Sequence, residues 1–396
     1  MSHLSTLLVG ILFLSPFAWA EQDLQTELTA PTSEQTLQLL SSVQQLVDDY
    51  YVDEVDKQQL LDGALKGMLE VLDPHSSYLR PQTLALLRDN NRGHYYGYGL
   101  EVAVEEGQIR IITPLDGSSA AAAGVLPGDV LLQVDELTAS ADNLDPLIAY
   151  IKQASLNDRS LKLVLQRPNA TEPIQFQVAP SAIDIATSAS RLLAQEVGYL
   201  KISSFNSRTA FEVRLAARQL QQQQLKGLVL DLRNNPGGLL DSAVQIADMF
   251  LSQGTIVTTH GRFFDANSDY HATEYNLFGD LPVVVLINQG SASAAEIVAG
   301  ALQDQGRAKL LGERSYGKGT VQSLIPLMGH GGAVKLTTAR YATPNGTFID
   351  QQGIKPDLPV ALAAATEDDI VTNLSLSNQW TDDPQLFAAY DYLLNQ

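Results

Sequence analysis

The sequence predicts a multidomain protein of mixed α/β class, with a layered α/β core in its second half. From about Gly198 onward, continuous apolar strands such as GLVLDLR and LPVVVLIN alternate with amphipathic helices, the pattern of a sheet covered by helices. Before that, from about Gly97, short strands are separated by Gly and Pro signals, which indicate a compact β-rich module. The 396 residues suffice for two or three domains.

The first twenty residues have the composition of a secretory signal peptide. An apolar run from Leu7 to Leu14 is followed by Pro16 and by the A-x-A pattern Ala18-Trp19-Ala20. The run is too short to span a membrane. We therefore expect export, most simply to the periplasm, with cleavage after Ala20; an uncleaved leader stays open because MSHLS contains no Lys or Arg.

Residues 21–90 are expected to form an N-terminal helical region. Leu37, Leu40, Val43, Leu46 and Val47 recur at spacings of three and four, which is typical of an amphipathic helix. The region is too thin to form its own core, so we expect it to pack on another domain or on a second subunit. The other expected segments are the β-rich module (91–180), the α/β core (181–362) and a C-terminal helical tail (363–396).

Within the core, strands and helices are expected to alternate. The expected strands are GYLKISSF, GLVLDLR, LPVVVLIN and AKLLGE, and the expected helices are residues 210–224, LLDSAVQIADMFL and AAEIVAGALQDQ. Two loops, NNPGG and QGSAS, each lead from a buried strand into a helix.

Composition excludes several classes of function. The chain has no cysteine, which rules out disulfides and thiol catalysis, and its net charge of −20 disfavours binding to nucleic acid or acidic lipid. The histidines of the mature chain form no H-E-x-x-H or similar ligand spacing. We expect no metal and no cofactor.

The stretch GERSYGKGTVQ nearly matches a nucleotide-binding loop. In that loop Ser or Thr follows the lysine directly, and a helix begins there. Here Gly319 takes the hydroxyl position, and the next residues, GTVQSLIPL, favour a strand. A phosphate-binding ATPase is therefore disfavoured.

Lys318 is instead a candidate general base. A desolvated lysine loses its proton more readily and can activate a serine hydroxyl. If the chain is extended here, Lys318 and Gln322 share one face, so Gln322 can aim the amine. The plainer interpretation is a surface lysine in a glycine turn.

Ser293, at the junction of a strand and a helix, is the candidate nucleophile. The helix N-terminus offers free amides to a developing oxyanion. However, Ser293-x-x-Glu296 is also a capping-box pattern. The NNPGG loop is either a turn that needs positive φ at a glycine or the source of a second backbone amide for the oxyanion, opposite Ser293. Asp231 and Arg233 are expected to form a structural ion pair.

The stretch GSASAAEIVAGALQDQGRAKLLGERSYGKGTVQ, with DLRNNPGGLL before it and LTTARYATPNG after it, closely resembles the C-terminal processing (tail-specific) peptidases. The likeness runs from LDPHSSYL to GIKPDLPV. In that family the nucleophilic serine precedes the base lysine by 25 positions, and a glutamine follows the lysine by four. Ser293, Lys318 and Gln322 have this spacing. The resemblance implies oxyanion amides at Ala294 and in the Gly237–Gly238 turn; Ala295 departs from a serine common in relatives, without chemical consequence.

The resemblance also implies a crotonase-like α/β peptidase core with an inserted PDZ domain. GYGLEV would be the carboxylate-binding loop, with amides from Gly99 and Leu100 and an apolar site near Leu100 and Val102. The expected function is an exported serine endopeptidase that selects protein substrates by apolar C-terminal tails. A catalytically inert PDZ scaffold would be favoured if Ser293 or Lys318 were replaced. Self-association through exposed apolar stripes on both helical ends, and regulation by an envelope adaptor protein, stay open.

Overall fold

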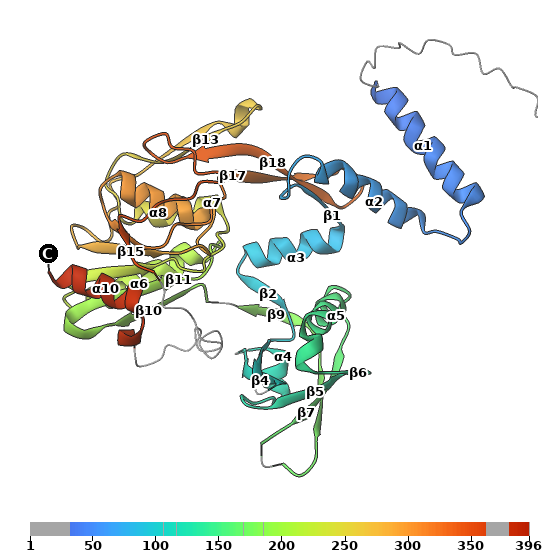
Figure 1. Cartoon of the computed structure of the whole chain (residues 1–396), viewed down its shortest axis with the longest axis horizontal. Coiled ribbons are helices and arrows are strands. Elements are labelled where there is room, and N and C mark those ends of the chain that lie inside the picture. Colours follow the sequence, from blue (N-terminus) through green and yellow to red (C-terminus); the bar gives the residue numbers. More distant parts are fainter. Residues whose placement is uncertain are drawn as a thin grey trace, which may run out of the picture. The chain divides into compact units, whose positions relative to one another are not determined.

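The computed structural model describes residues 32–361, except for 106, 116, 169 and 185, and residues 380–395. Figure 1 shows the elements in the colours of the sequence. The expected signal peptide (1–20) and residues 363–379 of the expected C-terminal tail lie outside the described residues. The chain divides into residues 1–64 and residues 65–396, which are described separately.

The smaller unit contains α1 (Ser33–Tyr50) and the beginning of α2 (Lys57–Glu70). Thr32 caps α1 in a reciprocal capping box with Gln35. No residue of α1 is buried, and Leu37 is 68% exposed. The expected helix is therefore present, and within the smaller unit its apolar side chains are exposed.

The larger unit begins within α2, which is followed by a tight turn, by β1 (Ser77–Leu79) and by α3 (Pro81–Asn91). Asp73 Oδ1 accepts hydrogen bonds from the N–H groups of His75 (2.7 Å) and Ser76 (2.8 Å). Ser76 Oγ donates to Asp73 Oδ2 (2.9 Å) and accepts from the N–H of Thr337 (3.1 Å). The DPHSSYL segment is thus a turn that fastens β1 to the core.

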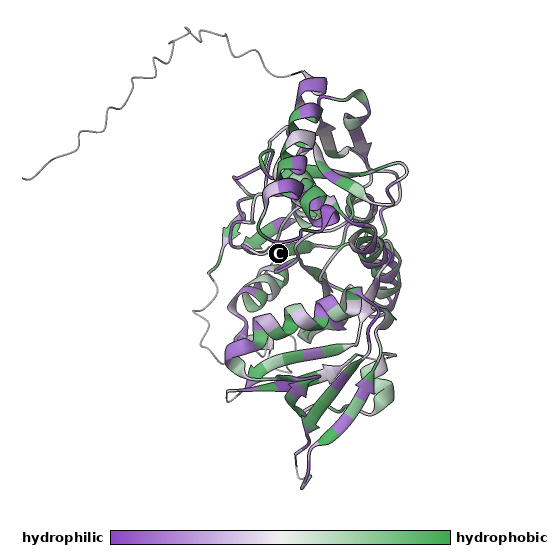
Figure 2. Cartoon of the chain, turned by 90° about the vertical axis from the view of Figure 1, so that its right-hand side faces the viewer, coloured by the Kyte–Doolittle hydropathy of each residue, from purple (hydrophilic) through white to green (hydrophobic). Residues whose placement is uncertain are grey.

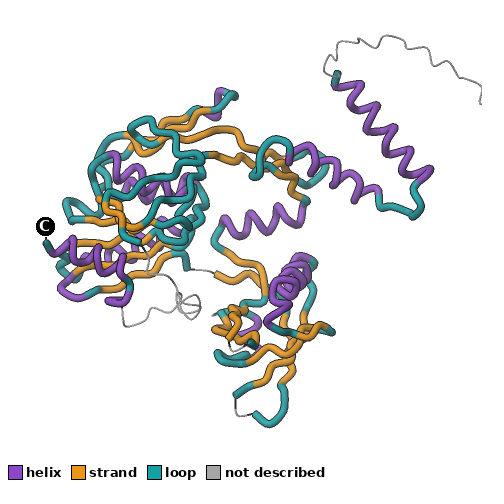
Figure 3. Tube along the Cα trace, in the orientation of Figure 1, coloured by secondary structure: helices purple, strands orange, loops and turns teal. Residues whose placement is uncertain are grey.

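The β-rich module is an antiparallel sheet with two helices. Its strand order is β3-β4-β5-β7-β8, with β6 beside β5; the elements are β3 (Leu100–Glu105), β4 (Gln108–Pro114), α4 (Ser119–Ala123), β5 (Val130–Val134), β6 (Leu137–Thr138), α5 (Leu144–Leu156), β7 (Leu161–Gln166) and β8 (Ile174–Val178). Figure 3 shows these strands in orange and α4 and α5 in purple. A two-stranded ribbon, β2 (His94–Gly97) with β9 (Ser181–Asp184), joins the module to the rest of the chain.

One face of this sheet forms a separate hydrophobic core. Ile111, Leu163 and Leu165 are completely buried there, and buried and more exposed residues alternate along β7, as expected for a sheet with one covered face. Figure 2 colours the chain by hydropathy and shows both hydrophobic (green) and hydrophilic (purple) bands along the strands.

The core contains the expected sheet, in the order β10-β11-β12-β15-β16-β19. Its strands are β10 (Ser188–Leu192), β11 (Val197–Ile202), β12 (Gly227–Asp231), β15 (Val283–Ile287), β16 (Lys309–Gly312) and β19 (Leu358–Pro359). All neighbours are parallel except β10 and β11. Every residue of β12 and β15 is buried, which explains their continuous apolar sequences.

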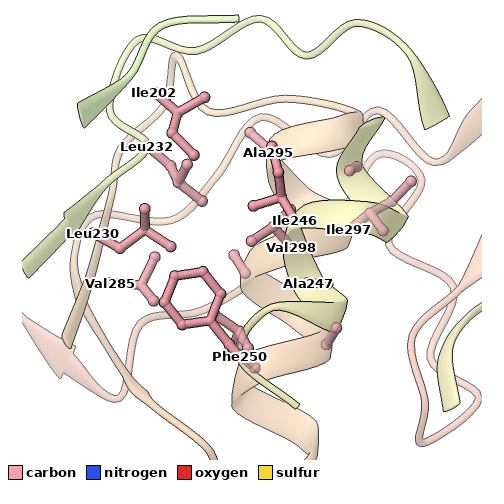
Figure 4. Close-up of a cluster of buried hydrophobic side chains, with 14 of the residues drawn as sticks. Ile202, Leu230, Leu232, Ile246, Ala247, Phe250, Val285, Ala295, Ile297 and Val298 are labelled. Atoms are coloured by element: carbon pink, nitrogen blue, oxygen red, sulfur yellow. The ribbon is translucent and has the colours of Figure 1, made fainter. Parts of the chain in front are cut away.

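Helices cover both faces of this sheet. On one face, α6 (Thr209–Gln221), α7 (Leu240–Asp248) and α8 (Ala294–Asp304) bury their apolar side chains against alternate residues of the strands. Figure 4 shows Ala295 and Val298 of α8 facing Leu230 and Val285 of the sheet. On the other face, Val229, Val284 and Leu286 pack against α10 (Pro384–Leu394).

A second sheet was not expected from the sequence. It has the order β1-β18-β13-β14, with β17 along the other edge of β18; the elements are β13 (Thr255–His260), β14 (Ser268–His271), β17 (Thr320–Pro326) and β18 (Ala333–Ala342). The extended conformation expected after Lys318 is confirmed as β17. Most residues of β17 and half of those of β18 are half-buried, whichever face of the sheet they lie on. The two strands therefore lack the alternation of buried and exposed residues that would mark them in the sequence.

The C-terminal helix corrects one expectation. Leu386, Ala389, Tyr390 and Leu393 of α10 are buried against the core sheet, so this helix does not offer the exposed apolar stripe expected for self-association. The expected ion pair between Asp231 and Arg233 is confirmed (2.7 Å), and it extends to Asp383 (2.8 Å) at the start of α10. The hydrophobic face and the ion pair together hold α10 on the sheet.

Among the described residues, no helix combines the length and the apolar character that are needed to cross a lipid bilayer.

Leu386→Ala should lower the free energy of unfolding of the core by about 2–5 kcal/mol, because it removes a buried leucine and leaves a cavity. The neighbouring Phe387→Ala is the matched control, since Phe387 is 47% exposed, and should stay within about 0.5 kcal/mol. Urea denaturation followed by circular dichroism measures both. Equal effects of the two substitutions would contradict the docking of α10.

Candidate active site

Ser293 lies between β15 and α8 in a strained backbone conformation. Its φ of 54° and ψ of −115° are unusual for a residue with a side chain, and such strain at a strand-to-helix turn is typical of an exposed nucleophile. Ser293 is half-buried, whereas Ser291 is completely buried. The Ser291 hydroxyl donates to the carbonyl oxygen of Leu232 (2.8 Å) and accepts from the N–H of Asn288 (3.0 Å), so it has a structural role.

Glu296, in the first turn of α8, connects the serine loop to the lysine loop. Its carboxylate is completely buried. Oε2 accepts hydrogen bonds from the backbone N–H of Ser293 (2.8 Å) and of Lys318 (2.9 Å). Oε1 accepts from the Ser315 hydroxyl (2.6 Å) and the Gly317 N–H (2.8 Å). The expected capping interaction is thus one part of a larger network that draws the two loops together.

Lys318 lies between two glycines that permit very close packing. A Cβ atom at Gly317 would lie 2.8 Å from the nitrogen of Gly353, and one at Gly319 would lie 2.5 Å from the nitrogen of Asp350. The half-buried amine of Lys318 has a lowered pKa, because burial disfavours its charge and the ammonium of Lys335 repels it; Glu296 partly opposes this shift. The charged form of this amine is therefore less favoured than that of an exposed lysine.

Gln322 lies on β17, four residues after Lys318. Its side-chain nitrogen donates to the hydroxyl of Thr320 (2.9 Å) and, more weakly, to that of Thr337 (3.4 Å). The bond to Thr320 is expected, because alternate residues of a strand lie on the same face. Among the described residues, the hydrogen bonds of this amide go to threonines and not to Lys318.

The NNPGG turn lies against the serine loop. A Cβ atom at Gly237 would lie 2.8 Å from the Cβ of Ser293 and 3.0 Å from the nitrogen of Ala294. However, the buried Gly237 N–H donates to the side chain of Asn235 (2.9 Å). The backbone bridge to Phe205 uses the carbonyl of Gly237 and the N–H of Leu239. The exposed Gly238 takes no part in those bonds, so of the two glycines it is the one whose N–H they leave available.

Ala294 is the first residue of α8. The first N–H groups of a helix have no acceptor within the helix, and they carry the positive end of its dipole. The amide of Ala294 therefore belongs to a positively polarised position directly after Ser293.

The GYGLEV loop begins the edge strand β3 of the β-rich module. Gly99 has a φ of +79°, and a Cβ atom there would lie only 2.1 Å from the Cβ of Ser118, the residue that caps α4. Leu100 and Val102 follow on β3 and pack, partly buried, against the core of the module. The loop thus lies against the beginning of α4 and leads into an edge of the sheet.

Two contributors to this site were not identified from the sequence. Tyr341, inside LTTARYATPNG, reaches both loops, and Lys335 repels the ammonium form of Lys318. Neither carries a local pattern, because each is brought to the site by the pairing of β18 with its neighbours. Among the described residues, no group of three His, Asp or Glu side chains is arranged to hold a metal.

Two family models match parts of this chain. Residues 196–360 match the peptidase family S41, and residues 13–83 match the N-terminal domain of the activating protease CtpB. The chain is 40% identical to the carboxy-terminal-processing protease of Bartonella bacilliformis over 78% of this chain and 71% of the relative. It is 35% identical to CtpB of Bacillus subtilis over 80% of this chain and 66% of that one.

Among solved structures, the photosystem II D1 C-terminal processing protease matches with a TM-score of 0.51 at 30% identity, covering 90% of this chain and all of that one. A protein with this fold and these relatives is a protease. The chain belongs to peptidase family S41, the carboxy-terminal processing proteases. The family suggested by the sequence motifs is thereby confirmed.

The pKa of the Lys318 amine should lie below the ordinary lysine value of about 10.5. Lys335→Met should raise it, because removal of a like charge makes protonation easier. The measurement is an NMR titration of the ¹³C-methylated amine. Lys226→Met is the control. Lys226 pairs with Glu196 (3.1 Å) and is not one of the charges that shift the pKa of Lys318, so its loss should leave the titration of Lys318 unchanged. A pKa that stays constant or falls in Lys335→Met would contradict the repulsion.

Proposed function

We propose that this protease is an exported serine endopeptidase that uses Ser293 as nucleophile and Lys318 as general base. The observation that carries the proposal is the pair of bonds to Glu296 Oε2. One oxygen atom accepts from the backbone N–H groups of both residues, which keeps the two loops within reach of each other. The spacing of 25 positions alone does not require this proximity.

Acylation begins with proton transfer from the Ser293 hydroxyl to the neutral Lys318 amine. The serine oxygen attacks the carbonyl carbon of the substrate, and the carbonyl oxygen becomes an oxyanion. The amides of Ala294 and Gly238 are the proposed donors to this oxyanion. The Lys318 ammonium then protonates the leaving amine, which departs and leaves an acyl-enzyme on Ser293.

Deacylation repeats these steps with water. Lys318, again neutral, takes a proton from water, and the hydroxide attacks the acyl carbon. As the ester bond breaks, the ammonium returns the proton to the oxygen of Ser293 and the free carboxyl product leaves. For Gln322 to orient the amine, its side-chain oxygen must accept a hydrogen bond from Lys318 Nζ, while its nitrogen keeps its threonine partners.

Substrate choice is assigned to the β-rich module, acting as a PDZ domain. Such domains add a peptide as an extra strand and capture its carboxylate with backbone amides. The edge position of β3 supports this role, with Gly99 and Leu100 offering amides and Leu100 and Val102 an apolar surface. The core, of crotonase-like type in this proposal, then cleaves the delivered chain.

The rival hypothesis is an inert PDZ scaffold of the cell envelope. It is disfavoured because Ser293 and Lys318 are both present and linked through Glu296. Export to the periplasm is proposed from the first twenty residues of the sequence. Self-association is proposed for the exposed stripe of α1 and no longer for α10; an adaptor protein stays open.

Ser293→Ala and Lys318→Ala should each lower kcat/KM by at least about a thousand-fold, and the double variant should be no worse, because nucleophile and base act as a unit. Gln322→Ala should be milder. Cleavage of a purified protein substrate, read by mass spectrometry, measures the rates while circular dichroism checks the fold. Near-normal cleavage by Ser293→Ala would refute the dyad, and a folded but inactive Ser291→Ala alongside it would move the nucleophile.

A peptide with a free C-terminal carboxylate should be cleaved about ten- to a hundred-fold better than its amidated twin at low concentration, because the charged contact with backbone amides is worth about 1.5–3 kcal/mol. Gly99→Ala should reduce this preference, since its Cβ would collide with Ser118. The paired rates of kcat/KM are the measurement. Equal rates for both peptides on the parent enzyme would end the tail-recognition proposal but not the protease assignment.

A further inference from the structure

Tyr341, near the end of β18, is almost completely buried, with 1% of its surface exposed. Its ring belongs to the main hydrophobic core of the peptidase part. Its backbone N–H donates to the carbonyl oxygen of Gly319 (3.0 Å). Tyr341 is therefore paired through its backbone with the residue after Lys318, while its ring is buried in the core.

The hydroxyl of Tyr341 meets two backbone carbonyl groups. It donates to the carbonyl oxygen of Lys318, and it lies 3.2 Å from the carbonyl oxygen of Ser293. One hydroxyl proton can be shared by two acceptors in a three-centre bond. A buried tyrosine needs only one acceptor to be satisfied, so the second contact is not required by burial alone.

The two acceptors belong to the same residues whose N–H groups bind Glu296. Glu296 therefore holds the N–H groups of Ser293 and Lys318, and Tyr341 holds their carbonyl groups. These four contacts involve two residues that are 25 positions apart in the sequence, in two different loops. Together they fix both backbones from both sides.

These hydrogen bonds hold Ser293 in its strained backbone conformation. A non-glycine residue with φ of 54° and ψ of −115° persists only when its surroundings hold it there. The N–H is held by Glu296, and the carbonyl is held by Tyr341 and by the N–H of Ile297 (3.0 Å). Loss of the tyrosine hydroxyl leaves the carbonyl with the helical bond alone.

Tyr341 is also a constant donor. Burial, together with the nearby charges of Glu296 and Asp350, raises the pKa of its phenol well above the usual value. The hydroxyl keeps its proton throughout the pH range in which the enzyme would work, so the bridge does not titrate with the base.

We propose that Tyr341 is a positioning residue for the protease reaction, whose hydroxyl bridges the carbonyl groups of Ser293 and Lys318 and so sets the distance between nucleophile and base. The inference rests on the proposed Ser293–Lys318 dyad. Tyr341 does not touch the substrate in this role; it acts through the two backbones.

The test compares Tyr341→Phe with the parent enzyme and with Tyr199→Phe. Tyr199 is the matched control, because its buried hydroxyl donates to Asp231 (2.8 Å) on the α10 side of the core sheet. Peptide cleavage gives kcat and KM, and the rate of labelling by a fluorophosphonate reports activation of the serine without tail recognition. Thermal unfolding of each variant reports the fold.

Tyr341→Phe should lower kcat and the labelling rate by about ten- to a hundred-fold, with KM within about two-fold, as expected when only the geometry of reaction is lost. Tyr199→Phe should lose thermal stability but keep kcat and labelling. A folded Tyr341→Phe with parental kcat and labelling would overturn the inference.

Tyr341→His serves as a second variant if Tyr341→Phe does not fold. Its shorter ring cannot reach both carbonyl groups, so it should also lose kcat and labelling; parental values would again overturn the bridge. Ser293→Ala and Lys318→Ala are run in the same assay. If they remain active, the dyad itself is wrong; if they are inactive while a folded Tyr341 variant is fully active, only the positioning role is wrong.

Discussion

The buried carboxylate of Glu296 is the constraint on which the rest of the site depends. A buried charge is tolerated only when it is well hydrogen-bonded, and this one has four donors from two loops. The requirement works in both directions: the loops satisfy the charge, and the charge keeps the loops in place. Any rearrangement that separates them leaves a buried carboxylate short of partners, at a cost of several kcal/mol.

The glycines around the site are needed because the serine and lysine loops pack so closely against their neighbours. Gly317 and Gly319 let the lysine loop pack onto residues 350–353, and Gly237 lets the NNPGG turn lie on Ser293. Substitution at any of them would push apart backbones that the hydrogen bonds of Glu296 pull together. Burial also lowers the pKa of the Lys318 amine, so the proposed base lies in the loop that these glycines allow to pack tightly.

Much of this could be predicted from the sequence, because it is written in local patterns. The continuous apolar runs of β12 and β15 and the amphipathic helices between them indicated the core sheet, and Ser293-x-x-Glu296 marked the beginning of α8. The remainder depends on contacts distant in sequence. The sequence around Glu296 has no pattern that predicts its hydrogen bonds with residues 315–318. The sequence around Tyr341 likewise has no pattern that predicts hydrogen bonds with two carbonyl groups. The strained φ of Ser293 has no signature in composition.

The short strand β1 has a consequence for how the chain can be divided. It lies in the segment that matches an N-terminal family domain, yet it pairs with residues 333–335 of β18, inside the peptidase match. A family boundary therefore passes through a continuous sheet. A fragment that begins after residue 83 would bare the backbone of β18 along this stretch, as an open template for strands of other molecules. The leading segment thus supplies the strand that covers this edge of β18, and its removal would favour unintended pairing between chains.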